Sequence, residues 1–373
     1  IEAVLAAMRA HPASQPVQQQ ACAALRGLAV NDDNQVKIAE LGGIEAVLAA
    51  MQAHPASQDV QQQACAALWK LTCSADNRVK IAGLGGIEAV LAAMRAHPDS
   101  QDVQKHACKM LCNLALNADN RVKIAGLGGI EAVLAAMQAH PASQPVQQQA
   151  CGALWSLAAN ADNQVKIAGL GGIEAVLAAM QAHPASQPVQ QQACGTLFNL
   201  AACGALWSLA ANADNQVKIA GLGGIEAVLA AMQAHPASQP VQQQACGALW
   251  NLAFHADNQV KIAGLGGIEA VLAAMQAHPA SQPVQQQACL ALWSLAANAD
   301  NQVKIAELGG IEAVLAAMRA HPVSQPVQGP ACGAIATLAA NADNQVKIAG
   351  LGGIEAVLAA MQAHPASQPV QQQ

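Results

Sequence analysis

The segment NADNQVKIAGLGGIEAVLAAMQAHP (Asn160–Pro184) contains two helices together with the residues that begin and end them. Asn and Asp at its start are residue types that cap helix N-termini, and the run GLGG predicts the end of a short first helix. A second helix follows, because apolar residues recur at i, i+3, i+4 and i+7 on one stripe. These residues are Ile173, Val176, Leu177 and Met180. The pair His183-Pro184 predicts the end of this second helix.

The next segment, ASQPVQQQACGTLFNLA (185–201), predicts a third and longest helix, with Ser186 near its cap and Pro188 in its first turn. The whole unit recurs along the chain. The phrase IEAVLAAM begins at Ile1, Ile44, Ile87, Ile130, Ile173, Ile225, Ile268, Ile311 and Ile354. The interval is 43 residues except between Ile173 and Ile225, where it is 52. A period of about 40–47 residues is typical of helical solenoids, so we predict an all-α array of stacked three-helix units.

The composition fits closely packed helices better than a sheet. The chain has 373 residues, no tyrosine, 2% aromatic residues and a net charge of −6. Lys and Arg form no run, so no nucleic-acid partner is predicted, and no apolar run approaches the ~20 residues of a membrane span. We find no phosphate loop, G-x-S-x-G, H-E-x-x-H or CxxC motif, and we therefore predict no enzyme, cofactor or metal site.

Nine of the eleven cysteines occupy one repeat position, as a small core residue would. They are Cys22, Cys65, Cys108, Cys151, Cys194, Cys203, Cys246, Cys289 and Cys332. This usage indicates the cytoplasm or another reducing intracellular compartment. The recurring His-Pro pairs are interpreted as helix C-termini, and the recurring lysines (Lys37, Lys80, Lys123 and onward) as a solvated face. His106, Cys108 and Cys112 are not expected to share a metal, because they fall on different faces of one helix.

The unit NADNQVKIAGLGGIEAVLAAM…VQQQACGALWNLA resembles the armadillo repeat over essentially the whole chain. The resemblance implies a right-handed superhelix whose third helices line a concave groove for extended peptides or partner proteins. In the importin-alpha branch of that family, the groove carries Trp at position 3 and Asn at position 7 of the motif ACGALWNLA. Here position 3 is mostly Gly or Ala, Trp stands at position 6, and acidic groove rims are absent. Binding of basic nuclear-localisation peptides is therefore not predicted.

Positions 1, 2, 4, 5, 8 and 9 of this motif fall on one side of a helix and are predicted to be core, whereas positions 3, 6, 7 and 10 face the other way. The repeats differ most at those four positions, as a recognition surface would. The predicted partner-binding groove consists of Arg26, Trp69, Lys70, Lys109, Asn113, Trp155, Phe198, Asn199, Trp207, Trp250, Asn251, Phe254 and Trp293.

The partner predicted from this surface is a protein or extended peptide. It is acidic where it lies on the first units, which carry Arg26, Lys70 and Lys109, and apolar over the later, aromatic ones. Three alternatives stay open: a structural spacer or assembly subunit with an empty groove, rings that merely pack on the neighbouring helix, and solvated cations unrelated to one another. The chain begins at Ile1, without a signal peptide, and we interpret it as a window cut from a longer array. Without capping repeats, we expect it to associate end to end or within a larger complex.

The long interval contains two near-copies in succession, ACGTLFNLA (193–201) and ACGALWSLA (202–210). Either nine residues were inserted or 34 were lost from two full repeats, and three differences between the copies favour the loss. Nine helical residues add a net half-turn. If the third helix continued through Ala202, its second apolar stripe would point away from the first. We therefore expect an irregularity and a break in the superhelix near residues 195–212, dividing the array into 1–201 and 202–373.

Overall fold

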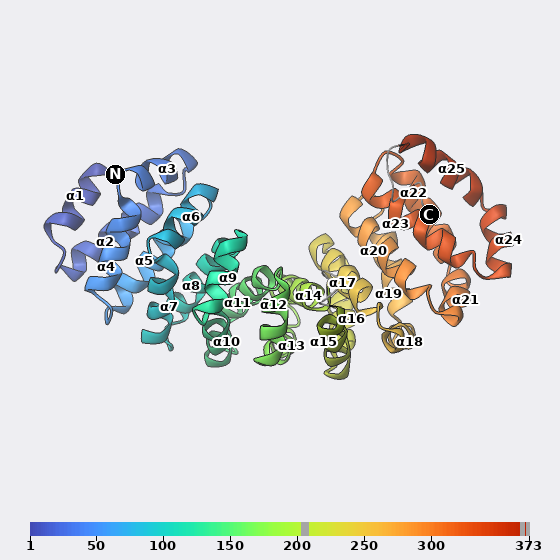
Figure 1. The fold of residues 1–373 in the computed structure, drawn as a ribbon, viewed down its shortest axis with the longest axis horizontal. Coiled ribbons are helices and arrows are strands. Elements are labelled where there is room, and N and C mark those ends of the chain that lie inside the picture. The colour runs from blue at the N-terminus through green and yellow to red at the C-terminus, as the bar shows by residue number, and fades with distance from the viewer. Residues whose placement is uncertain (203–208, 366–369, 371–373) are drawn as a thin grey trace. The chain divides into compact units, whose positions relative to one another are not determined.

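The computed structural model describes residues 1–202, 209–365 and 370, without the side chains of residues 209–212. These residues form an all-helical chain (Figure 1). Its contacts divide it into two compact units, residues 1–183 (unit 1) and residues 184–373 (unit 2), and each is described by itself.

Three kinds of helix alternate, as the sequence predicts. The first helices are α3 (Asp32–Glu40), α6 (Ala75–Gly83), α9 (Ala118–Gly126), α12 (Ala161–Gly169), α15 (Leu209–Gly221), α18 (Ala256–Gly264), α21 (Ala299–Glu307) and α24 (Ala342–Gly350). The second helices are α1 (Glu2–Ala10), α4 (Gly43–Ala53), α7 (Gly86–Ala96), α10 (Gly129–Ala139), α13 (Gly172–Ala182), α16 (Gly224–Ala234), α19 (Gly267–Ala277), α22 (Gly310–Ala320) and α25 (Gly353–Ala363). The third helices are α2 (Gln15–Leu28), α5 (Gln58–Leu71), α8 (Gln101–Leu114), α11 (Gln144–Leu157), α14 (Gln187–Ala201), α17 (Gln239–Leu252), α20 (Gln282–Leu295) and α23 (Gln325–Leu338).

The residues predicted to begin and end the helices do so in the repeat that contains Asn160 and Gly171. The Oδ1 atom of Asn160 accepts a hydrogen bond from the backbone N–H of Asn163 at 3.0 Å, which caps α12. Gly171 then adopts φ +81°, a left-handed conformation that glycine reaches without strain. A Cβ on the following Gly172 would lie 2.7 Å from the carbonyl oxygen of Ile167. The two glycines therefore allow α13 to begin immediately after α12 ends.

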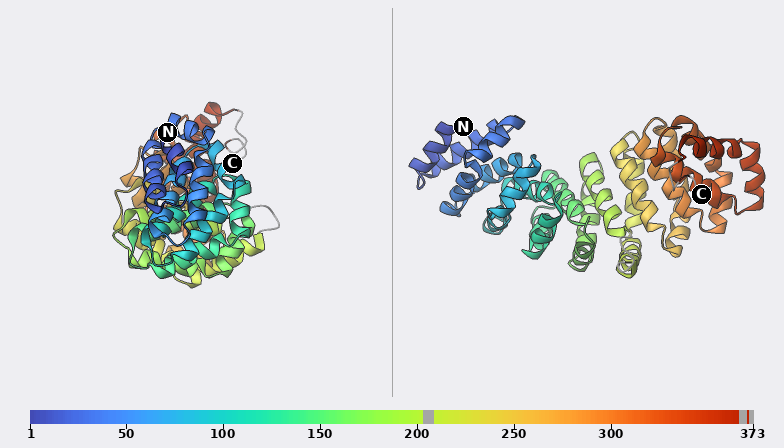
Figure 2. Two further views of the ribbon diagram at one scale, coloured as in Figure 1. Left: turned by 90° about the vertical axis from the view of Figure 1, so that its left-hand side faces the viewer. Right: turned by 45° about the horizontal axis from the view of Figure 1, so that its top comes forward.

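The predicted core positions are confirmed. In α13 the side chains of Ile173, Val176, Leu177 and Met180 are at most 5% exposed. In the third helices of the interior repeats, motif positions 1, 2, 4, 5, 8 and 9 are buried wherever their side chains are described. The repeat-position cysteines are buried as well, except Cys203, which lies outside the described residues. Successive third helices pack side by side within each unit. Figure 2 gives two further views of the helices.

Polar ladders connect each repeat to the next. In one ladder the Nε2 atom of a histidine donates to the carbonyl oxygen of the preceding repeat's proline, as His54 does to Pro12 at 2.8 Å. In a second ladder the Nζ atom of Lys166 bonds the Ala125 carbonyl oxygen at 2.7 Å and Glu131 Oε1 at 2.9 Å. The first-helix lysines that repeat this contact are Lys80, Lys123, Lys261, Lys304 and Lys347. The interpretation of the recurring lysines as a solvated face was wrong for these lysines, because each reaches an orphan carbonyl at the end of the preceding first helix, whereas Lys37 is exposed as expected.

The irregularity expected near residues 195–212 is present, because α15 has 13 residues where first helices such as α12 have 9, but the expected break in the superhelix was wrong. Helix α14 does not run on: it ends at Ala201, and Ala202 is extended with ψ 129°. The amides of Asn215 and Gln216 donate to the carbonyl oxygens of Leu200 and Ala201 at 3.1 and 3.0 Å. These partners are 15 residues apart instead of the usual 6, so the nine extra residues lie between Ala201 and Asn215.

The next repeat stacks normally beyond this point. Asn258 Nδ2 donates to the Gln216 carbonyl oxygen at 3.3 Å, and α14 packs along α17 as other neighbouring third helices do. A break at this point would expose the faces that α14 and α17 bury against each other. The division of the array at residues 201 and 202 stays a prediction.

Candidate partner-binding surface

The predicted groove residues lie toward the C-terminal ends of the third helices. Most of their side chains are half-buried, and Phe254, at position 10, is 52% exposed. Asn251 is an exception, since it is only 3% exposed. Trp207 lies outside the described residues. The half-buried members are Arg26, Trp69, Lys70, Lys109, Asn113, Trp155, Phe198, Asn199, Trp250 and Trp293.

Position 3 faces the groove side in the sequence pattern, but it is buried in most repeats, and at Gly333 and Gly247 the preceding repeat's ring covers it. A Cβ placed on Gly333 would lie 2.8 Å from Cδ2 and Cε2 of Trp293. A Cβ on Gly247 would lie 3.2 Å from Cδ2 of Phe198. For these two rings, packing on the neighbouring third helix is therefore observed. Both rings are still partly exposed, so they also present an edge to solvent.

In unit 1, five residues from three helices form a group that we call the Trp69 cluster: Arg26, Trp69, Lys70, His106 and Lys109. The Nζ atoms of Lys109 and Lys70 lie 3.8 and 4.5 Å from the centroid of the Trp69 ring. The His106 ring stacks on it, with centroids 6.2 Å apart and an interplanar angle of 29°. The cluster thus combines an aromatic surface with cations held over it.

Burial and neighbouring charges perturb two members of this cluster. Burial lowers the pKa of Lys109 from its ordinary value, and the positive charges of Lys70 and Lys105 lower it further. Burial, followed by the charge of Lys105, lowers the pKa of His106 to about 4, so this imidazole is neutral at pH 7.

In unit 2, three aromatic residues form a second group, the aromatic cluster of Phe198, Trp250 and Phe254. The Phe198 and Trp250 centroids are 6.3 Å apart, and those of Trp250 and Phe254 are 5.9 Å apart. Such tilted pairs are favourable ring arrangements. Position 10 carries Phe only here, which is the sequence signal for this cluster.

Asparagine at position 7 links neighbouring repeats at Asn251 and Asn113. Asn251 Nδ2 donates to the Phe198 carbonyl oxygen at 2.9 Å, and Asn113 Nδ2 donates to Thr72 Oγ1 at 3.1 Å. Sequence reasoning missed this role, because nothing in the pattern identifies the acceptor. The amide of Asn251 is therefore engaged within the protein.

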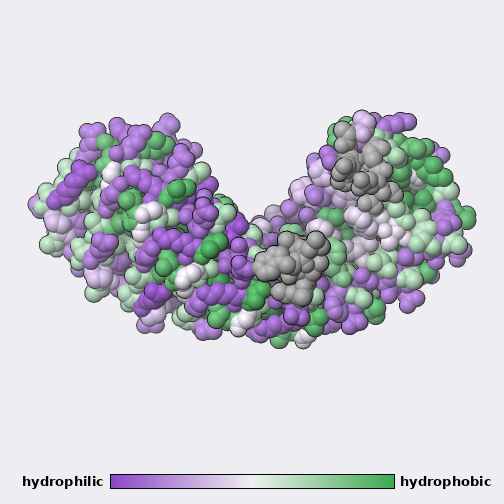
Figure 3. Space-filling model, viewed as in Figure 1, coloured by the Kyte–Doolittle hydropathy of each residue, from purple (hydrophilic) through white to green (hydrophobic). Residues whose placement is uncertain are grey.

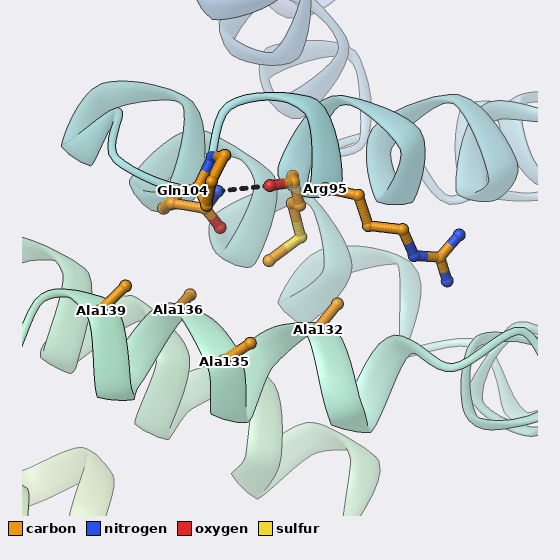
Figure 4. Close-up of a pocket in the computed structure, with 8 residues that line it drawn as sticks. Arg95, Gln104, Ala132, Ala135, Ala136 and Ala139 are labelled. Carbon is orange, nitrogen blue, oxygen red and sulfur yellow. Dashed lines mark hydrogen bonds between the residues drawn. The ribbon is translucent and has the colours of Figure 1, made fainter.

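A small cavity between second helices offers little chemistry. It has a volume of about 100 Å³ and lies between α7 and α10 (Figure 4). Ala132, Ala135, Ala136 and Ala139 line one side, and Gln104 on the other side donates its amide to the Met94 carbonyl oxygen at 2.8 Å. Similar cavities of about 120 Å³ recur between α1 and α4 and between α4 and α7. Their walls are mostly methyl groups and they present no reactive side chain.

Exposed apolar residues recur singly on the first helices. Val165 and Leu170 are 51% and 42% exposed, and their equivalents in other repeats are similar. Figure 3 shows hydrophilic residues over much of the visible face of unit 1, with hydrophobic ones scattered among them. Scattered apolar residues are ordinary on protein surfaces and mark no site.

Two features of the described part of the chain bear on metal binding and membrane insertion. No group of three or more His, Cys, Asp or Glu side chains is placed to hold a metal ion within residues 1–202 and 209–365. Over the same residues no single helix is long and apolar enough to cross a membrane, although five sharply bent helix pairs reach the required length and composition together.

Comparison with known families matches the chain to the LRRK2 ARM repeat over residues 1–118 and 44–373. No curated protein matches. Among solved structures, a chain from a study of a phosphorylation switch in the interaction between cadherin and beta-catenin is similar, with a TM-score of 0.69 and 18% identity. The match covers 93% of this chain and 65% of that one, so the chain spans less than two thirds of its structural relative. At this identity the likeness shows the fold, the armadillo solenoid.

Proposed function

The chain belongs to the LRRK2 ARM repeat family, and from that premise we propose that its third-helix faces bind an extended segment of a partner protein. Repeat domains of this kind generally bind proteins on extended surfaces and act as scaffolds without catalysis. The observation that carries the proposal is the pattern of variation. The second helices are almost identical in sequence, whereas third-helix positions 6, 7 and 10 vary and hold partly exposed aromatic and charged side chains.

The two units present different chemistry to such a segment. The third-helix face of unit 1 carries Arg26, Lys70 and Lys109, and that of unit 2 carries the aromatic cluster. A partner that matches them has acidic residues for unit 1 and apolar residues for unit 2. The basic face steers and orients the partner, and the aromatic face contributes most of the affinity.

The test separates these two contributions by kinetics. Partners are captured from a cell extract, identified by mass spectrometry and measured against purified chains. Reversing the charges of Arg26, Lys70 and Lys109 together should slow association and flatten its salt dependence. Substituting Trp250 and Phe254 by Ala should mainly speed dissociation. Charge reversal of Lys37, an exposed first-helix lysine, is the matched control. A native partner whose binding ignores both sets of changes would show that these faces are not the binding site.

A further inference from the structure

The positively charged third-helix residues of unit 1 are departures from an otherwise uniform repeat, and they converge. Arg26 replaces the aromatic residue usual at position 6, and Lys70 replaces Ser or Asn at position 7. Lys109 replaces the usual Gly or Ala at position 3. The pair Lys105-His106 replaces Gln-Gln. In a chain with a net charge of −6, this local excess of positive charge needs an explanation.

The converging charges act on one another across helices. Lys70 on α5 and Lys109 on α8 both lie over the Trp69 ring. Lys70 and Lys105 each lower the pKa of Lys109, and the charge of Arg26 on α2 acts on His106. Like charges this close repel, so the arrangement destabilises the free protein unless an anion joins it.

Counter-charges on the protein do not neutralise this group. Lys105 is paired with Asp102, with Nζ and Oδ1 2.6 Å apart. The first-helix lysines are paired with glutamates of the preceding repeat. Within the described residues, Arg26, Lys70 and Lys109 have no carboxylate within 4.0 Å, and His106 is neutral at pH 7. Among the described residues, the Trp69 cluster therefore carries three positive charges that no carboxylate neutralises, although Lys70 and Lys109 lie over the Trp69 ring.

We propose that the Trp69 cluster binds a phosphate monoester carried by a side chain of a partner protein. A phosphate monoester has a charge near −2 at pH 7 and three acceptor oxygens, which suit cations arriving from α2, α5 and α8. A carboxylate offers one charge and two oxygens and leaves most of the positive charge unmatched. This inference rests on the proposed function for its partner segment, but the phosphate site itself can be tested without a partner.

The test uses phenyl phosphate as the probe and tryptophan indole N–H resonances as the readout. The five tryptophans give five resonances, and the variants Trp69→Phe, Trp250→Phe and Trp293→Phe assign the three that the test needs. Titration at pH 7.5 and constant ionic strength should shift the Trp69 resonance saturably and leave those of Trp250 and Trp293 in place. Benzoate, a monoanion with a similar ring, should bind at least tenfold more weakly. Equal affinity for the two probes overturns the assignment of a phosphate monoester.

Substitutions that restore the repeat consensus keep the fold and remove the charges. Lys109→Ala installs the residue of Ala66, and Lys70→Ser that of Ser156. Each should weaken phenyl phosphate binding at least fivefold. The control is Arg121→Gln, which removes one positive charge from unit 1 on α9 and installs the residue found at Gln164. It should change the affinity less than twofold. Equal weakening by all three variants reduces the effect to general electrostatics and overturns the site.

The outcomes also separate this inference from the proposed function. If phenyl phosphate binds the cluster but no protein binds the third-helix faces, the phosphate site stands and the proposed function fails. If a partner binds and treating it with phosphatase leaves its affinity unchanged, the proposed function stands and the phosphate assignment is overturned. If vesicles of phosphatidylserine shift the Trp69 resonance as strongly as phenyl phosphate does, the partner-protein source of the phosphate is overturned.

Discussion

Replacing Gly333 by Ala tests whether the aromatic ring at position 6 of one repeat packs against position 3 of the next repeat. The new Cβ would lie 2.8 Å from Cδ2 and Cε2 of Trp293 and 3.0 Å from Cε3. Cβ atoms essentially never approach other atoms this closely, so the indole ring or helix α23 has to move.

Two effects of opposite sign determine the result. Alanine in a helix is favoured over glycine by about 1 kcal/mol. Overpacking a fitted contact costs about 1–3 kcal/mol. For Gly333→Ala we expect overpacking to exceed the propensity gain, giving a net loss of about 1 kcal/mol. Gly27 in α2 has no atom within 4 Å of an added Cβ, so Gly27→Ala should gain up to about 1 kcal/mol. Gly247, with Phe198 at 3.2 Å, should fall between the two.

The assay is urea unfolding followed by circular dichroism, together with hydrogen exchange in α23, because repeat arrays need not unfold in two states. The expected order of stability is Gly27→Ala, then Gly247→Ala, then Gly333→Ala. The fluorescence of Trp293 should also change in the Gly333→Ala variant. If Gly333→Ala is as stabilising as Gly27→Ala, the ring is not packed on position 3 and the reasoning fails.

Three further predictions follow from other contacts. The pKa of His106 is lowered from 6.5 to about 4, so the stability that its neutral form contributes is present above pH 6.5 and is lost as the pH falls toward 4. Urea titrations of the parent chain and of His106→Gln at pH 6.5 and pH 4 should show that the variant lacks about 1–2 kcal/mol of this loss, after a discount for solvent screening. Equal acid sensitivity of the variant and the parent would contradict this. Thiol labelling of the folded chain should modify the exposed Cys73 at once and spare core thiols such as Cys65 and Cys151, because burial raises the pKa of these two thiols to about 12. Rapid labelling of the core thiols would refute their burial. Lys261→Gln removes a half-exposed ion pair with Glu226 and a hydrogen bond to the Ala220 carbonyl oxygen, and should lower the free energy of unfolding in urea by about 1 kcal/mol. No measurable loss would show that the lysine ladder does not stabilise the stacking of repeats.

The fold could be predicted from the sequence because each helix boundary has a local cause. Asn160 caps α12, Gly171 ends it, and the stripe through Ile173 and Met180 is buried as the period requires. The helix periodicity also identified the core positions of the third helices, but it placed position 3 and Asn251 on the other side, where the structure buries most of them. These features depend on residues a few positions apart, so a single repeat contains all the necessary information.

Contacts between repeats could not be predicted in the same way. The lysine ladder was misread because Lys166 and its acceptor at Ala125 are 41 residues apart. The burial of Asn251 and the seating of Trp293 on Gly333 likewise depend on how the next repeat is placed. Periodicity indicates which side of a helix a residue occupies, but not whether a neighbour's ring already covers it.

The stretch around Ala201 and Ala202 bears on how such a chain can change its length. A gene made of near-identical units gains and loses segments when it is copied. Here the amides of Asn215 and Gln216 find the carbonyl oxygens of Leu200 and Ala201 across nine additional residues. Each repeat is therefore aligned by its own side-chain bonds, whatever the length of the connection. Length changes that fall after a third helix are absorbed locally, whereas the same change within α14 would rotate Leu197 and Leu200 out of the core. The fold therefore tolerates a change of length after a third helix but not within one.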